Sequence, residues 1–432
     1  MLWAAVAAGA CLVAPASASA GAAEFFASPG GVPTAACTEA DPCDIRTAVD
    51  SASSGQSVRL LGGEYELGNV DLSLNDGQDV FADDPSQPVG LNFDDPANSS
   101  SSPAVYVGPD ARLADVTVTS DFLLGAVRIR GVVDRVTAVS TRDATINQGD
   151  SFTIACSVNL GTIRDSLCLQ TENGSAIGYS PFGGYTGGTV RGVTAASAAG
   201  SAFAVVPYTG DIEFDIRNSI LLGGYASQTS IPDVEIETGD NTSTADVDID
   251  FSNFDLVSVN GNGSTDFEVS QPGSGSNQTA APLFADLAGG DFHQAAGSPT
   301  IDAGDGSASD LGSLDLDRTA RVQGDSIDIG AYETAGPPDP DTTKPTVKIT
   351  KGPAKKTRAR NATFRFTGSD DMGPVLFSCR LDGKPARPCS SPTTYRNLKP
   401  GRHSFALTGS DDAGNKTTKR YAWKVVKKKR RG

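Results

Sequence analysis

The side chains best suited to chemistry are acids that gather between positions 302 and 328, among glycines and serines. Ca²⁺ prefers hard oxygen ligands on turns, and extracellular calcium sites tolerate weak affinity. Ca²⁺ is therefore the one cofactor considered, with Asp302, Asp305, Asp315, Asp317 and Asp328 as its candidate ligands. Their spacing is neither an EF-hand nor the nonapeptide calcium repeat. The alternative, which we favour, is that these acids accept hydrogen bonds from turn amides and pair with Arg318 and Arg321.

Catalytic side chains are harder to nominate. Two carboxylates across a cleft can serve as acid and base, and carboxylates are plentiful before position 336, although that part of the chain has no lysine. Asp94 and Asp95 are adjacent in a loop and are expected to be solvated. The two histidines, His293 and His403, have no recognisable serine and aspartate partners and are expected to be structural. No catalytic residue is predicted.

The cysteines suggest an oxidising compartment. Cys11 lies in an N-terminal apolar stretch, and the other six fall into local pairs that we predict to be disulfides: Cys37–Cys43, Cys156–Cys168 and Cys379–Cys389. Metal ligation is the competing interpretation, but the chain has no Cys-x-x-Cys motif and only two histidines. Because the loops between partners are short, each bond is expected to constrain a loop or a cap.

Residues 1–20 have the pattern of a signal peptide. An apolar run leads to Ala18-Ser19-Ala20, which is typical of a cleavage site. Lipoprotein processing at Cys11 is the weaker alternative. No later stretch has the roughly 18 apolar residues that a membrane-spanning helix needs. We therefore expect a secreted protein, extracellular or associated with the cell surface.

A half-buried strand pattern recurs along the middle of the chain. Strings such as LADVTV, VDRVTAV and IRNSILL recur at intervals of 20 to 33 residues, anchored by Leu113, Val133, Ile163, Val190, Ile216 and Ile249. Such a period predicts a solenoid, in which each coil buries its apolar side chains only by stacking on the next. We expect four further residues to point inward as neighbours in successive coils: Val116, Val136, Leu167 and Ile220.

A short amphipathic helix precedes the repeats. Ile45, Ala48, Val49 and Ala52 recur at helical spacing, and the sequence SSGQ then ends the helix. Such a helix can cover the first rung of a stacked sheet, whose backbone groups would otherwise be unpaired. We place this N-terminal cap at residues 30–68.

The last quarter of the chain has a different character. Residues 336–345 are proline-rich and predict a stiff linker, and alternating apolar and polar residues over 346–426 predict a small β-sandwich, followed by a basic tail at 427–432. Acids outnumber Lys and Arg by 45 to 12 up to position 335, whereas Lys and Arg outnumber acids by 23 to 7 afterwards. The two domains are therefore expected to meet different partners.

Two resemblances fit these patterns. The DIRTAV and GGEY strings, the repeated rungs and a closing segment at residues 280–335, which ends in IDIGAYE, resemble the right-handed parallel β-helix of the pectate-lyase-like superfamily, with a C-terminal segment of the choice-of-anchor type. The later strings FSCRLDG and DDAGN resemble bacterial immunoglobulin-like modules. The implied fold is all-β: a right-handed parallel β-helix solenoid over 21–335, followed by an Ig-like β-sandwich.

The resemblance implies two classes of function. Parallel β-helices include polysaccharide lyases and glycosidases, but fold does not imply function, and this chain has no aligned catalytic motif. We expect a monomer that binds a glycan or cell-wall polymer, or associates with a surface, without catalysis. The alternative is a polysaccharide lyase or glycoside hydrolase acting on an acidic or plant-type polysaccharide.

The basic domain and its tail predict a second kind of partner. An anionic cell-wall polymer or phospholipid surface is expected, held by attraction that salt weakens. Nucleic acid is not expected, because the chain is exported and its first domain is strongly acidic. A solvated tail without a target is the other interpretation.

Overall fold

The computed structural model describes residues 23–95, 102–122, 124–143, 153–179, 187–205, 211–227, 230–237, 244–260, 267–335, 343–370, 374–411 and 414–427. The chain divides after position 337 into two compact units. The predicted leader and most of the predicted linker and basic tail lie outside the described residues. Among the helices that are described, none is long and apolar enough to cross a membrane.

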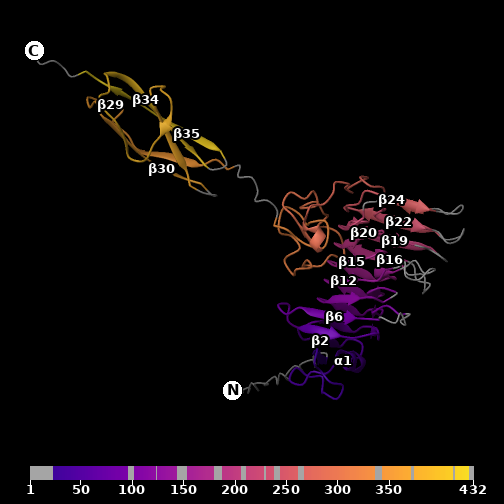
Figure 1. Ribbon diagram of the computed structural model, residues 1–432. Coiled ribbons are helices and arrows are strands. Elements are labelled where there is room, and N and C mark those ends of the chain that lie inside the picture. The colour runs from indigo at the N-terminus through magenta and orange to yellow at the C-terminus, as the bar shows by residue number, and fades with distance from the viewer. Residues whose placement is uncertain are drawn as a thin grey trace, which may run out of the picture. The chain divides into compact units, whose positions relative to one another are not determined.

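Three parallel sheets form the first unit (Figure 1). Sheet A contains β1 (Glu24–Ala27), β2 (Ser57–Leu60), β5 (Asp79–Ala82), β8 (Arg112–Ala114), β11 (Val132–Asp134), β14 (Thr162–Arg164), β17 (Gly188–Arg191), β20 (Ile212–Arg217), β23 (Ala245–Asp250) and β25 (Phe267–Val269). Sheet B contains β3 (Gly63–Glu66), β6 (Val89–Phe93), β9 (Thr117–Ser120), β12 (Thr137–Ser140), β15 (Leu167–Gln170), β18 (Thr194–Ser197) and β21 (Ile220–Leu222). Sheet C contains β4 (Leu72–Leu74), β7 (Val105–Val107), β10 (Val127–Ile129), β13 (Ile154–Val158), β16 (Ser175–Tyr179), β19 (Phe203–Val205), β22 (Val234–Glu237) and β24 (Val257–Asn260).

The chain visits the sheets in the order A, B, C, and each visit is one coil of a parallel β-helix. Each strand pairs in register with the corresponding strands of the coils before and after it. The six predicted anchors, Leu113 to Ile249, form a single row of sheet A, and all of them are buried in the core. The predicted solenoid and this inward row are therefore confirmed.

In six successive coils, one left-handed residue makes the corner between sheets A and B. The corner residues have φ between 47° and 62°, and they are Asp115, Arg135, Asp165, Gly192, Asn218 and Phe251. Asp, Asn and Gly adopt this conformation at least cost, which explains why the repeated strings so often place them after an apolar strand. The next residue is serine in three coils, and each hydroxyl accepts an N–H of the preceding coil: Ser166 from Val136, Ser219 from Val193 and Ser252 from Ser219.

The prediction that four side chains point inward is confirmed for two of them and wrong for the other two. Val116 and Val136 belong to the core inside the solenoid. Leu167 and Ile220 stand one position later in their coils, in a row with Thr194 that faces out of sheet B. Both are nevertheless buried, because a later part of the chain covers this outer face. Leu167 and Ile220 are thus buried on the outer face of sheet B and not inside the solenoid.

The covering part is the closing segment (residues 280–335). It contains β26 (Phe284–Asp286), a 3₁₀ turn (Leu287–Gly289) and β27 (Asp291–Gln294), followed by irregular turns. Its buried Phe292, Ala331 and Tyr332 pack against Leu167 and Leu169 of β15. The outer face of sheet B is thereby converted into a second apolar core.

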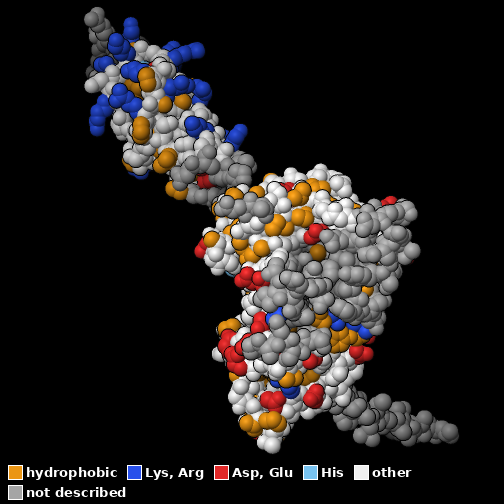
Figure 2. Space-filling view, turned by 45° about the vertical axis from the view of Figure 1, so that its right-hand side comes forward, with side chains coloured by type: hydrophobic (Ala, Val, Ile, Leu, Met, Phe, Trp, Pro, Cys, Tyr) orange, Lys and Arg blue, Asp and Glu red, His pale blue; other side chains and the backbone are white. Residues whose placement is uncertain are grey.

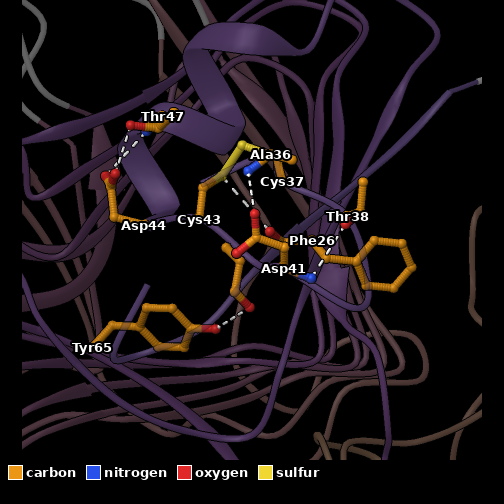
Figure 3. The surroundings of a disulfide bond; sticks show 10 residues. Phe26, Ala36, Cys37, Thr38, Asp41, Cys43, Asp44, Thr47 and Tyr65 are labelled. Atoms are coloured by element: carbon orange, nitrogen blue, oxygen red, sulfur yellow. Dashed lines mark hydrogen bonds between the residues drawn. A yellow bond between two sulfur atoms is a disulfide. The ribbon is translucent and has the colours of Figure 1, made fainter. Parts of the chain in front are cut away.

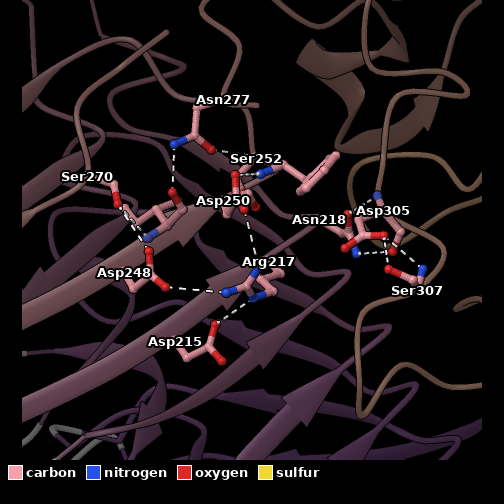
Figure 4. Close-up of polar contacts among 12 residues, drawn as sticks. Asp215, Arg217, Asn218, Asp248, Asp250, Ser252, Ser270, Asn277, Asp305 and Ser307 are labelled. Atoms are coloured by element: carbon pink, nitrogen blue, oxygen red, sulfur yellow. Dashed lines mark hydrogen bonds and ion pairs between the residues drawn. The ribbon is translucent and has the colours of Figure 1, made fainter. Parts of the chain in front are cut away.

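Corner residues hold the closing segment in place. Asn218 exchanges two hydrogen bonds with the backbone of Asp305, at 2.6 and 3.1 Å (Figure 4). Further along the segment, the N–H of Gly312 donates to the buried carboxylate of Asp165 at 2.8 Å, and Arg318 forms an ion pair with Asp115 at 2.9 Å. The row that turns the chain therefore also binds its last part.

The N-terminal end of the solenoid contains the predicted helix, together with a disulfide. Helix α1 (Ile45–Ser51) is capped by Asp44, which accepts the N–H of Thr47, and it buries Ile45, Ala48 and Val49. The Cys37–Cys43 disulfide lies beside it (Figure 3). The covering structure also includes β1, which precedes the helix and pairs with β2.

The second predicted disulfide is also present, but its setting differs from the expectation. Cys156 of β13 and Cys168 of β15 are bonded, and both side chains lie fully buried in the solenoid core. The bond therefore joins two sheets across the interior and does not constrain an exposed loop.

The second unit consists of two sheets around one core. The first contains β28 (Thr346–Lys351), β30 (Ala362–Ser369) and β33 (Thr393–Tyr395), and the second contains β29 (Lys356–Thr357), β35 (Lys416–Val425), β34 (Gly401–Ser410), β31 (Leu376–Leu381) and β32 (Arg387–Pro388). Phe364 of the first sheet stacks on Phe405 of the second at 3.9 Å between ring centroids. The Cys379–Cys389 disulfide is formed at the edge near β32. This arrangement is a small β-sandwich.

Replacing Ile220 by Asp tests the outer core. The new carboxylate would be buried between sheet B and Gly330 of the closing segment, so we expect the free energy of unfolding to fall by roughly 3–5 kcal/mol, the cost of an uncompensated buried charge. Thr117→Asp is the matched control, because Thr117 stands in the same row but is exposed, and it should cost less than about 0.5 kcal/mol. Equal melting of the two variants would show that the closing segment does not cover Ile220.

Candidate functional site

The outer face of sheet B changes character along the solenoid. One row runs Glu64, Gly90, Thr117, Thr137, Leu167, Thr194 and Ile220, and its neighbour runs Glu66, Asn92, Thr119, Val139, Leu169, Ala196 and Leu222. The apolar half of both rows lies under the closing segment. The polar half remains exposed or half-buried, and we name Glu64, Glu66, Asn92, Thr117, Thr119 and Thr137 the polar shelf.

Side chains of the polar shelf are already ordered by mutual contacts. The amide of Asn92 donates to Glu64 and to Glu66, both at 3.0 Å. Just after the same strand, the side chain of Asp94 lies beside that of Asp121. The pKa of Asp94 is raised, mainly by partial desolvation and secondly by repulsion from Asp121. Asp95, expected to be solvated, is instead buried.

A cleft of about 340 Å³ opens where the shelf meets the closing segment. Its walls are the loop containing Pro85 and Pro88, the row residues Thr117 and Thr137, and the closing-segment residues Leu316, Asp317, Arg318 and Tyr332. The lining combines hydroxyls, charges and one phenol ring. Burial raises the pKa of Tyr332, so this phenol stays protonated and can serve as a hydrogen-bond donor.

The charged groups of the cleft are largely committed to one another. Asp115 is bound by Arg135 through two hydrogen bonds of 2.7 and 3.1 Å, and by Arg318 at 2.9 Å. Because both guanidinium groups are occupied by this carboxylate, neither is positioned as a free base.

His293 lies at the rim of the cleft between two carboxylates. Its Nε2 is 2.7 Å from Asp317, its Nδ1 contacts Asp291, and its ring lies 4.1 Å from that of Tyr332. Burial alone would lower the pKa of His293, but the hydrogen bonds to Asp291 and Asp317 outweigh it and raise the pKa. The ring of His293 therefore links Asp291 to Asp317 at the edge of the cleft. His403, in the sandwich, binds Asp382 and the carbonyl of Lys399.

The five predicted calcium ligands are not brought together. Four of these carboxylates accept backbone N–H groups: Asp302 from Ser326, Asp305 from Ser307, Asp315 from Thr319 and Glu333, and Asp328 from Asp302 and Thr334. The fifth, Asp317, contacts His293. Across the described ranges, no three His, Cys, Asp or Glu side chains form a group that could hold a metal ion. The observed bonds are those of the alternative, turn-stabilising interpretation.

Arg321 forms a buried charged centre beneath the closing segment. It is 3.2 Å from Asp165 and 3.3 Å from Glu333, and all three side chains are almost fully buried. Burial raises the pKa of Glu333 to about 8 and that of Asp165 to about 6, against the opposing effect of Arg321. The alternative interpretation paired Arg318 and Arg321 with the acids between 302 and 328, and this part of it is wrong. Their partners are Asp115 and Asp165, at distant corners, and Glu333.

Sequence reasoning missed the cleft residues Thr117, Thr137 and Tyr332. A signal was present, since the repeated strings carry Thr where later coils carry Leu or Ile at the same position. This change from Thr to Leu or Ile can be recognised only when the strands are aligned by their pairing.

Comparison with known proteins adds little to this geometry. No protein-family model matches the sequence, and no curated protein matches it. Among solved structures, the crystal structure of pectate lyase Pel9A matches with a TM-score of 0.42 and 14% sequence identity, covering 72% of this chain and 96% of that chain. The strand pairing described above, and not this match, establishes the parallel β-helix.

The raised pKa of Glu333 predicts a pH dependence of stability. Its ordinary value is 4.5 and its value in the fold is about 8, so the folded chain retains a proton that the unfolded chain releases between these pH values. This contribution to the free energy of unfolding is therefore complete below about pH 4.5 and is lost as the pH rises through 8. Asp165 acts in the same direction at lower pH.

Thermal melting between pH 5 and pH 8.5 measures this effect. In Glu333→Gln the side chain is neutral throughout, so we expect a weaker fall of Tm with pH than in the unaltered chain. Asp325→Asn, an exposed position in the same segment, should leave the fall unchanged. A Glu333→Gln profile parallel to that of the unaltered chain would contradict the assignment.

Proposed function

We propose that this chain is a secreted protein that binds a polysaccharide on the polar shelf and the adjoining cleft, without cleaving it. The observation that carries the proposal is the abrupt change in the rows of sheet B. The closing segment covers their apolar half and stops where hydroxyl, amide and carboxylate side chains begin.

The geometry of the shelf suits an extended polymer. Rungs of a parallel sheet are about 4.8 Å apart, so Glu66, Asn92 and Thr119 present hydrogen-bonding groups at a regular interval along the solenoid. Sugar hydroxyls can bond with such groups. The cleft at one end adds Tyr332 and Pro85, whose apolar faces can contact a sugar ring.

The arrangement favours binding over cleavage. Arg135 and Arg318 are both engaged by Asp115, so neither is free to abstract a proton from a uronate. Asp94 and Asp121 are within hydrogen-bonding distance of each other, closer than the roughly 5–10 Å between glycosidase carboxylates. A lyase or hydrolase remains the alternative, and the experiment below separates it from binding.

Secretion and surface association complete the proposal. The signal-peptide pattern at residues 1–20 is joined by three disulfides, which persist in oxidising compartments. The β-sandwich, which we take to be an Ig-like module, would then serve as a spacer or anchor through its basic surface.

A polysaccharide panel tests the function. The chain should bind at least one polysaccharide without releasing reducing ends or unsaturated uronate. Combining Asn92→Ala with Thr119→Ala should weaken that binding about tenfold, equivalent to about 1.4 kcal/mol, with little change in melting, because neither side chain belongs to the core.

Thr162→Ala with Thr189→Ala is the matched control. These two threonines stand in one outer row of sheet A, away from the shelf, and should leave affinity within twofold. Turnover on any member of the panel would favour the enzyme alternative, and equal losses in both double variants would remove the shelf as the binding surface.

A further inference from the structure

The cations of the two units differ in whether they form ion pairs. In the described solenoid, Arg59, Arg112, Arg135, Arg164, Arg191, Arg217, Arg318 and Arg321 all form ion pairs. In the described part of the sandwich, no lysine or arginine does, and the one ion pair joins His403 to Asp382. Figure 2 shows the basic side chains standing out over this unit. The sandwich therefore presents cations that are free to bind an external anion.

Six of these cations share one face of the sandwich. In the five-stranded sheet, Phe405 and Trp423 point into the core, so the alternate positions point outward. Those outward positions carry what we name the cationic face: Lys356, Arg380, Arg402, Lys416, Arg420 and Lys424. Asp382, which adjoins this face, is already held by His403 and by the N–H of Ser404.

The charges on this face are arranged in rows with small neutral residues between them. Arg402 lies opposite Lys424, and Arg380 and Arg420 lie on either side of Ala406. Along β35, every fourth residue is a cation, which corresponds to about 13 Å between charged rows. Ala422 and Thr418 occupy the intervening positions, and their small side chains leave room for a ligand to lie flat.

From this arrangement we propose that the cationic face binds an acidic polysaccharide, with its arginines contacting the carboxylates of the polymer. Arginine matches a carboxylate with two parallel hydrogen bonds. The centre of the cationic face has no aromatic or large apolar side chain that could insert into a bilayer, as an interfacial membrane site requires. The exposed Leu376 lies only at the corner of this face. A polymer is thus a better partner than a lipid surface.

This inference rests on the proposed role of the sandwich as an anchor, but its site is separate from the polar shelf. The acidic solenoid would repel a polyanion, whereas the sandwich attracts one. The two units can therefore hold different polymers, one through neutral hydrogen bonding and the other through charge.

The test uses the full chain and alginate, a uronate polymer, at 50 and 300 mM salt. Combining Arg380→Gln, Arg402→Gln and Arg420→Gln should weaken alginate binding at least tenfold at low salt. The unaltered chain should itself bind more weakly at 300 mM. Far-ultraviolet circular dichroism and melting of the sandwich should not change, because all three side chains lie on the outer face.

The control has the same change in net charge. Lys348→Gln, Lys351→Gln and Arg365→Gln remove three cations from exposed positions of the other sheet and should leave affinity within twofold. Equal weakening of both triple variants would overturn the proposal in favour of net charge alone. Binding to phosphatidylglycerol vesicles without binding to alginate would also overturn it.

The outcome is independent of the shelf experiment. Combining Asn92→Ala with Thr119→Ala should not affect alginate binding. If the cationic-face variant loses alginate while the polysaccharide panel shows no shelf-dependent ligand, the inference stands and the proposed function fails. If the shelf binds its ligand and the cationic-face variant keeps full affinity for alginate, the reverse holds.

Discussion

Backbone pairing between successive coils is the constraint on which the first unit depends. Because every strand bonds in register with the coil before and after it, each position in a coil becomes a row along the solenoid. A row has one environment along its whole length only if its residues are of one type. The inward row from Leu113 to Ile249 is apolar and buried throughout. The outer rows of sheet B do not, and their change from threonine to leucine divides a polar shelf from a buried surface.

The corner row shows how one position can serve two purposes. A left-handed residue turns the chain from sheet A to sheet B, and Asp and Asn adopt this conformation more readily than most residues. Their side chains project outward at the corner, where Asn218, Asp165 and Asp115 bind the closing segment. Arg321, Asp165 and Glu333 are buried together in that contact. Because the pKa values of both acids are raised there, the stability of the covered sheet B depends on pH.

The two units use charge in opposite ways. In the solenoid, many arginines form ion pairs with its own acids, and the acids remain in excess. In the sandwich, cations stand on a flat sheet without partners. Surface ion pairs contribute little to stability, so leaving cations unpaired costs the sandwich little and makes them available to a ligand.

The features that depend on local pattern could be predicted from the residues alone. The solenoid period, its inward row, the apolar face of α1 and the three cysteine pairs all follow from residue types within short windows. The tertiary structure alone decided which way Leu167 and Ile220 face, because their strands, β15 and β21, bury neighbouring residues on both faces of the sheet. It also decided where the closing segment lies, since Arg318 meets Asp115 across 203 positions. Only the stacking of coils brings such residues together, and the cleft exists because of that contact.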